Sequence, residues 1–169
     1  AAIGIIPGET AANEDTPYNY WTANDYIFSK YVGELECREY IRRGLPAVIV
    51  NPALPFGWGD LGPTPTGGLV LALMNGKFPG YIDGGVNVVD VQDVARGHVL
   101  AEAKGRVGER YILGAHNVST RDFMLLVGRV CGVRTPQRQL SAKWMGRLGR
   151  VLEEMADRVT HKAPFITEK

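Results

Sequence analysis

Apolar positions follow two different spacings along the 169-residue chain. Residues 47–50 are apolar throughout, which is typical of a short strand buried on both faces of a parallel sheet. Other segments repeat apolar residues every three or four positions, which predicts amphipathic helices. We predict strands at residues 1–6, 47–50, 81–82, 86–91 and 110–113, and helices at residues 22–43, 69–74, 93–104 and 119–132. Strands and helices in this alternating order indicate an α/β fold.

Two stretches rich in proline, glycine and small polar residues interrupt these elements. Residues 7–21 predict a long loop, and long loops in compact domains are usually functional or mobile. Residues 51–68 predict a second break, which we interpret as the passage from one domain to the next. A last amphipathic segment begins near Ser141, and its apolar stripe fits either the inner side of a packed helix or a contact between subunits.

The helix predicted at residues 22–43 carries the residues with the clearest chemistry. Tyr26 and Lys30 lie four positions apart and are therefore neighbours on one helical face. A phenol alone is a poor proton donor or acceptor at neutral pH, but a neighbouring ammonium favours the phenolate. Such a pair suits proton exchange with a carbonyl or an alcohol. A pair of exposed surface residues explains this short pattern equally well, so the rest of the chain has to decide.

Five segments of the chain, in order, resemble the extended short-chain dehydrogenase/reductases. This family includes nucleotide-sugar epimerases and dihydroflavonol reductases, and the resemblance covers nearly the whole chain. Tyr26 and Lys30 match its Y-x-x-x-K motif. The other matches are residues 1–4, which resemble the segment after the strand of the catalytic serine or threonine, residues 51–57 (N-P-x-x-x-x-G), residues 88–95 (F-V-H-V-D-D-V-A in the family) and residues 108–114 (G-E-R-Y-I-L-G).

The resemblance implies a fold and a division of the chain. We expect the C-terminal part of a doubly wound Rossmann-type parallel sheet, joined to a small α/β substrate-binding domain. Residues 1–56, with residues 86–104 returning to them, would be the distal part of the dinucleotide-binding domain. Residues 57–169 would mainly bind substrate.

The resemblance also implies an NAD(P)-dependent oxidoreductase acting on a small-molecule substrate. Tyr26 would exchange a proton with the substrate oxygen, and Lys30 would hold the nicotinamide ribose and tune Tyr26. The residues expected against the nicotinamide are Pro52, Ala53 and Leu54, with Thr66 as a further candidate. NAD or NADP would move the hydride, and nothing in the chain predicts which of the two is used.

Two features of the family are not found in the chain. The glycine-rich phosphate loop is absent, and the catalytic serine or threonine would fall just before Ala1. We therefore expect either an enzyme cut at both ends or a non-catalytic relative that acts as a binding module. Residues 57–62 do fit G-x-G-x-x-G after a strand. Because Pro63 and Pro65 follow them instead of a helix, we interpret this segment as an active-site loop.

Two apolar residues bear on the substrate. Sugar-nucleotide epimerases usually have an asparagine where this chain has Leu54, and an arginine for the diphosphate near Val86. A diphosphate needs hydrogen bonds and positive charge, which neither side chain offers. This pattern favours a ketone or an alcohol as substrate, with nucleotide-sugar epimerisation or dehydration as the alternative.

The overall composition argues against several other classes of protein. The net charge is +1 and the basic residues are spread along the chain, so we expect no nucleic-acid partner. No apolar run reaches the roughly 18 residues that span a membrane. Cys37 and Cys131 are predicted to be buried, reduced thiols of a cytoplasmic protein. The histidines (His98, His116 and His161) are scattered, so we expect no metal. A homodimer is the one protein assembly that the resemblance suggests.

Overall fold

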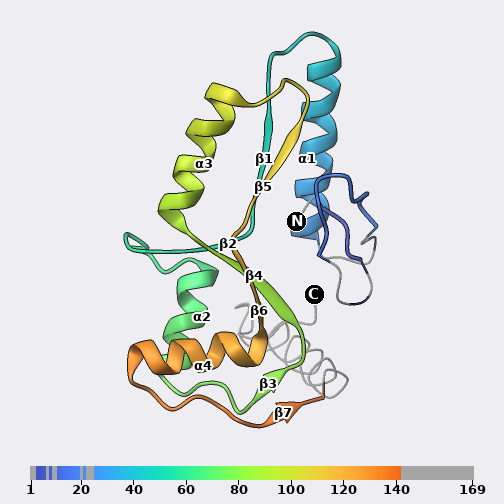
Figure 1. Ribbon diagram of the computed structural model, residues 1–169. Helices are drawn as coiled ribbons and strands as arrows, with labels where there is room; N and C mark the ends of the chain where they lie inside the picture. The colour runs from blue at the N-terminus through green and yellow to red at the C-terminus, as the bar shows by residue number, and fades with distance from the viewer. Residues whose placement is uncertain (1–2, 7, 9–10, 20, 22–24, 142–169) are drawn as a thin grey trace, which may run out of the picture. The chain divides into compact units, whose positions relative to one another are not determined.

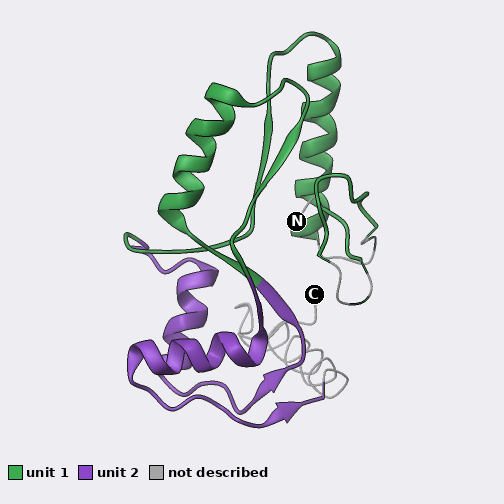
Figure 2. Cartoon of the chain, viewed as in Figure 1, with its two compact units in different colours: residues 1–59, 87–116 green, residues 60–86, 117–169 purple. Residues whose placement is uncertain are grey.

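The computed structural model describes residues 3–6, 8, 11–19, 21 and 25–141. The chain, drawn in Figure 1, forms two compact units, which Figure 2 shows in green and purple. The first unit contains residues 1–59 and 87–116, and the second contains residues 60–86 and 117–169. Both units combine helices with parallel strands, so the prediction of an α/β fold is confirmed.

The first unit is built on a pair of parallel strands between two helices. Strands β1 and β5 pair so that Ile49 lies opposite Arg110 and Pro52 lies opposite Leu113. Figure 1 shows helices α1 and α3 on either side of this pair. The bounds of these elements are Asp25–Arg42 for α1, Ile49–Pro52 for β1, Val91–Lys104 for α3 and Arg110–Leu113 for β5.

Helix α3 packs closely on the strand pair because a glycine lies at the contact. A Cβ atom on Gly97 would fall 2.7 Å from Cδ2 of Leu113, which is closer than side-chain atoms approach one another. The helix begins where the side chain of Asp90 accepts a hydrogen bond from the N–H of Gln92. Val94 and Ala101 are buried on its inner face.

Helix α1 buries a charged residue and exposes apolar ones. Glu34 is its one buried residue, and the apolar stripe formed by Phe28, Val32 and Leu35 is exposed. The inner face of α1 is therefore held by polar contacts, which are described below with the candidate site.

The other strands form a three-stranded sheet and a second strand pair. The order in the three-stranded sheet is β2-β4-β6, and β2 runs parallel to β4 with Leu54 opposite Val88. Strand β4 begins in the second unit and ends in the first. The parallel pair β3 and β7 belongs to the second unit. The bounds are Leu54–Phe56 for β2, Tyr81–Ile82 for β3, Gly85–Asp90 for β4, His116–Ser119 for β6 and Gln139–Leu140 for β7.

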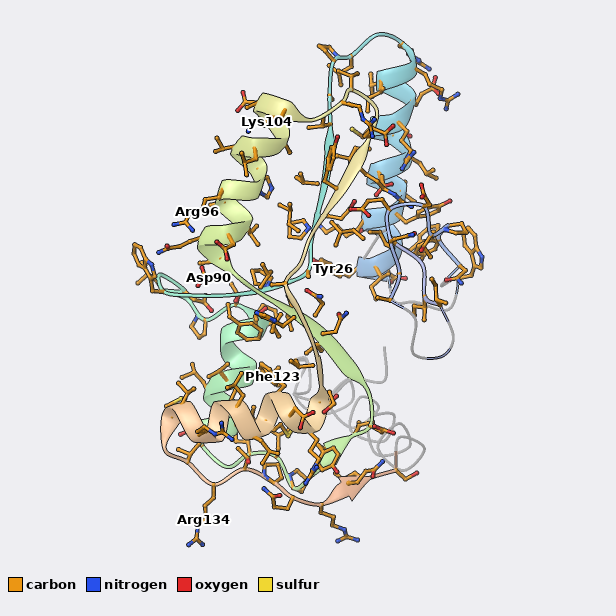
Figure 3. All side chains as sticks on the ribbon, in the orientation of Figure 1. Tyr26, Asp90, Arg96, Lys104, Phe123 and Arg134 are labelled. Atoms are coloured by element: carbon orange, nitrogen blue, oxygen red, sulfur yellow. The ribbon has the colours of Figure 1, made fainter. Side chains whose placement is uncertain are left out.

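The core of the second unit lies between two helices. Helix α4 packs on α2 and on β3, and the buried side chains come from both helices. Ser119 caps the start of α4, and Gly132 ends it in a left-handed conformation with φ of 68°. The helices are α2 (Pro65–Met74) and α4 (Thr120–Cys131), and the buried residues are Ala72, Leu73, Phe123, Met124 and Val127 (Figure 3 labels Phe123).

The structure corrects three local predictions and contains three strands that were not predicted. Residues 3–6 form no strand, because the side-chain amide of Asn19 bonds to both the N–H and the C=O of Ile5 in place of a neighbouring strand. Helix α2 begins at Pro65 rather than Leu69, since proline is well accommodated in a first helical turn. Cys37 and Cys131 are free, as expected, but half-buried rather than buried. Strands β2, β6 and β7 were not predicted.

Other predictions concern the long loop and the two ends of the chain. The long loop at residues 7–21 contains no helix or strand where the structure describes it. Residues 22–24, at the start of the helix predicted at residues 22–43, and the segment after Ser141 lie outside the described residues. Within the described residues, no helix is long and apolar enough to cross a membrane, and no group of side chains could hold a metal ion.

Candidate active site

Tyr26 and Lys30 lie at the N-terminal end of α1, in the first unit. Figure 3 labels Tyr26. The Nζ atom of Lys30 is 5.2 Å from the centre of the Tyr26 ring. Both side chains are exposed, and 65% of Tyr26 is accessible. Among the described residues, neither the phenol nor the ammonium forms a hydrogen bond or an ion pair, so both polar groups are available to a ligand.

An apolar wall formed by Pro52, Ala53 and Leu54 lies where β1 ends and β2 begins. Ala53 and Leu54 are half-buried and Pro52 is exposed. The N–H of Ala53 donates to the carbonyl of Leu113 at 3.0 Å, which ties the wall to the end of β5. The carboxyl ends of parallel strands are where open α/β sheets bind their ligands.

Thr66 is the one predicted site residue outside the first unit. It is half-buried on α2 in the second unit, whereas Tyr26, Lys30 and the apolar wall belong to the first. The structure thus places five of the six predicted residues in one compact unit.

A buried polar cluster connects α1 to the strand pair, and the sequence did not predict it. Glu34, one turn beyond Lys30, accepts hydrogen bonds from Asn51 at 3.1 Å and from Arg110 at 3.0 Å. Arg38 donates to the same carboxylate. The side chain of Glu34 is 6% exposed and that of Arg110 is 11% exposed. One feature of the sequence could have indicated the cluster, because the charged residues Lys30, Glu34 and Arg38 lie four positions apart along one side of the helix.

The G-x-G-x-x-G segment is a loop before α2, and side chains of the protein already bind the N–H groups at the start of that helix. Helix α2 does follow residues 57–62, and it begins at Pro65 after the capping residue Thr64. The carboxylate of Asp60 accepts hydrogen bonds from both the N–H and the hydroxyl of Thr64, at 2.9 Å each. The N–H of Gly67 bonds to the hydroxyl of Thr64. A carboxylate therefore stands where a phosphate would have to bind, which agrees with the interpretation that this is no cofactor loop.

The second unit contains an apolar pocket of about 710 Å³. Its volume is within the range of pockets that take small molecules. Among the described residues that line it, Lys77 is the one with a charge. The larger apolar side chains are those of Leu69, Phe78, Tyr81, Ile82, Met124 and Leu140.

The sequence of residues 4–114 matches the NAD dependent epimerase/dehydratase family. The chain belongs to this family. A putative dihydroflavonol 4-reductase of Synechocystis is 39% identical over 116 residues, which are 66% of this chain and 34% of that protein. The sterol demethylase protein B of Methylococcus capsulatus is 29% identical over 150 residues, or 85% of this chain and 44% of that protein.

A solved structure extends the likeness to the fold. A nucleoside-diphosphate-sugar epimerase from Pseudomonas aeruginosa superimposes with a TM-score of 0.79 at 34% identity, covering 92% of this chain and 52% of that one. The chain thus spans between about a third and about half the length of these family members. By their names, the relatives are enzymes that include both a reductase and an epimerase.

Proposed function

We propose that this chain carries the acid/base half of an NAD(P)-dependent oxidoreductase site that interconverts a carbonyl and an alcohol. The observation that carries the proposal is the pairing of Tyr26 with Lys30. Their side chains are adjacent and exposed on the first two turns of α1, and no other described residue engages either polar group.

In the direction of reduction, the Oη atom of Tyr26 donates its proton to the substrate oxygen as that oxygen gains negative charge. The ammonium of Lys30 stabilises the phenolate that remains. In the direction of oxidation, the phenolate takes the proton of the substrate hydroxyl. When bound, the nicotinamide supplies or accepts the hydride at the substrate carbon.

The described residues fit the nicotinamide half of such a cofactor. Lys30 offers an ammonium that no described carboxylate neutralises, and ammonium groups bind ribose hydroxyls as donors. The half-buried surface of Ala53 and Leu54 suits the flat face of an aromatic ring. We assign Tyr26, Lys30, Pro52, Ala53 and Leu54 to this half, with Thr66 of the second unit as a further contact.

A small, mainly apolar carbonyl compound is the substrate class that we favour. The pocket in the second unit is lined largely by apolar side chains, with Lys77 as the one charged residue among those described. Leu54 and Val86 add no hydrogen-bonding group. The names of the reductase and sterol demethylase relatives point in the same direction.

Nucleotide-sugar epimerisation is the second candidate. The resemblance to the Pseudomonas aeruginosa epimerase, at 34% identity, favours it. An epimerase would use the same Tyr26 and Lys30 for proton transfer. It would also need cations for the diphosphate, so a nucleoside diphosphate should then protect the protein against thermal unfolding.

One assay distinguishes these candidates. The protein, purified at the full length that its gene encodes, is incubated with NADPH or NADH and a panel of aromatic and alicyclic ketones. We expect cofactor oxidation that depends on Tyr26, and no thermal protection by UDP or dTDP. Protection by a nucleoside diphosphate, without ketone reduction, would favour epimerisation.

A non-catalytic binding module is the alternative of another class. It predicts neither cofactor binding by calorimetry nor cofactor turnover. The predicted homodimer stays a prediction, which the mass of the protein in solution would test.

A further inference from the structure

We propose that Glu34 and Arg110 are positioning residues that set where Tyr26 and Lys30 stand relative to the apolar wall. The proposal rests on the function proposed above, because it concerns the same acid/base pair. It is carried by a network of hydrogen bonds that joins four segments of the first unit.

Arg110 lies at the start of β5 and uses all three of its nitrogens on different acceptors. Its Nε donates to the carbonyl of Glu14 at 2.6 Å, and its Nη2 donates to the carbonyl of Thr16 at 2.8 Å. Its Nη1 donates to the carboxylate of Glu34 at 3.0 Å. One guanidinium thus holds the loop at residues 11–19 and helix α1 to the same strand.

Glu34 extends the network from the helix to the apolar wall. One of its oxygens accepts from Arg110 and from Arg38, and the other accepts from the amide of Asn51 at 3.1 Å. Asn51 directly precedes Pro52 in β1. The other polar atom of that amide, Oδ1, is buried, and none of the described residues forms a hydrogen bond to it. The amide is therefore held in place through its bond to Glu34, although burying its oxygen unpaired is unfavourable.

Aromatic stacking holds the loop to the helix beside the acid/base pair. The ring of Tyr18 stacks on that of Tyr31, with centres 4.0 Å apart and an interplanar angle of 12°. Tyr31 directly follows Lys30 in α1. Trp21 packs edge-on against both rings. The loop is thus connected to two successive turns of α1, through Tyr31 beside Lys30 and through Arg110 to Glu34.

These contacts give the network a positioning role. Neither Glu34 nor Arg110 hydrogen-bonds to Tyr26 or Lys30, but the bond between Glu34 and Asn51 joins the helix that carries Lys30 to the strand that carries Pro52. The planar guanidinium directs donors on three separate nitrogens at three acceptors, whereas a lysine would keep the charge but place its three donors on one nitrogen. Small displacements of a catalytic group are enough to slow a reaction strongly.

Two variants of the full-length enzyme test the proposal, Arg110→Lys and Glu34→Gln. We expect each to lower kcat about tenfold or more while changing the KM for ketone less than about threefold. Amide hydrogen exchange should rise in residues 11–19 and in the first turns of α1, and stay unchanged in α3. The matched control is Arg96→Lys, because Arg96 pairs with Asp93 on the exposed face of α3.

The outcomes separate this proposal from the proposed function. A Tyr26→Phe variant that is inactive, beside an Arg110→Lys variant with wild-type kcat and exchange, would overturn the positioning role alone. An active Tyr26→Phe variant would overturn the proposed function, and the exchange data would still show whether the network holds the loop and helix. Exchange that rises equally in α3 would reduce Glu34 and Arg110 to general stabilisers and would also overturn the proposal.

Discussion

Lys30 holds its ammonium 5.2 Å from the centre of the Tyr26 ring, from one turn further along α1. A cation at this distance from an aromatic ring is attracted to it, so the two side chains restrict each other's rotamers. The pair is therefore partly arranged before any ligand binds.

Removal of the Tyr26 hydroxyl should abolish proton transfer without affecting the fold. We expect Tyr26→Phe to lower kcat by about 10²-fold to 10⁴-fold, the usual contribution of a general acid or base. Steady-state oxidation of NADPH at saturating ketone measures the effect. Tyr40→Phe is the matched control, because Tyr40 is also an exposed tyrosine of α1 but lies near its other end. Equal activity of the two variants would remove Tyr26 from the mechanism.

Removal of the Lys30 ammonium should weaken both cofactor binding and catalysis. We expect Lys30→Met to raise the Kd for NADPH and to lower kcat, because the ribose loses a donor and the phenolate loses its counter-charge. Fluorescence titration of NADPH gives the first quantity and ketone reduction gives the second. Lys104→Met, at the end of α3, removes an equally exposed lysine and should change neither. If Lys30→Met binds NADPH as the wild type does, the ribose contact is wrong.

Asp60 should stabilise the start of α2. Asp60→Ala removes the acceptor for both polar groups of Thr64, and we expect the free energy of unfolding to fall by about 1 kcal/mol, as for other helix caps. Urea unfolding followed by circular dichroism measures the change. Asp83→Ala offers a comparison in the same unit, since the carboxylate of Asp83 bonds to the N–H of the next residue, Gly84. Similar losses in the two variants would argue against a capping role.

Two helical glycines should respond to alanine with opposite signs. At Gly97 the new methyl group would meet Leu113 at 2.7 Å, and we expect the free energy of unfolding to fall by about 1–3 kcal/mol from overpacking. At Gly33 a Cβ atom has no neighbour within 4 Å, so alanine should stabilise the protein by about 0.5–1 kcal/mol through its higher helix propensity. Thermal or chemical unfolding of the two variants gives both values. A stabilising Gly97→Ala would show that α3 does not pack on β5 as described.

The sequence predicted most of the fold because most of its elements carry local signals. Helices α3 and α4 were predicted close to their observed bounds, and a glycine follows each of them. Helix α3 begins at Val91, two residues before its predicted start, because Asp90 caps it. Strand β2 contains Pro55, and β7 has only two residues, so neither shows an apolar period. Such strands are defined by the neighbour they pair with, which no local pattern contains.

In the candidate site, the contacts between residues close in sequence could be predicted, and those between distant residues could not. Tyr26 and Lys30 are four residues apart, so helical geometry alone brings them together. Glu34 and Arg110 are 76 residues apart, and their contact depends on the parallel pairing of β1 with β5. The apolar stripe of α1 lies on its exposed face, so the apolar pattern gives no sign that the helix meets the strands through Glu34.

The loop at residues 11–19 has a further consequence, for how the protein avoids pairing with other chains. Strand β5 has one strand neighbour among the described residues, β1, and the N–H of Ile112 is taken by the carboxylate of Glu14 at 2.9 Å. An open strand edge attracts strands from other molecules and promotes aggregation. Glu14 covers this edge with a side chain that cannot extend the sheet, and it places a negative charge there. The loop therefore leaves one fewer N–H group of this edge open to a strand of another molecule.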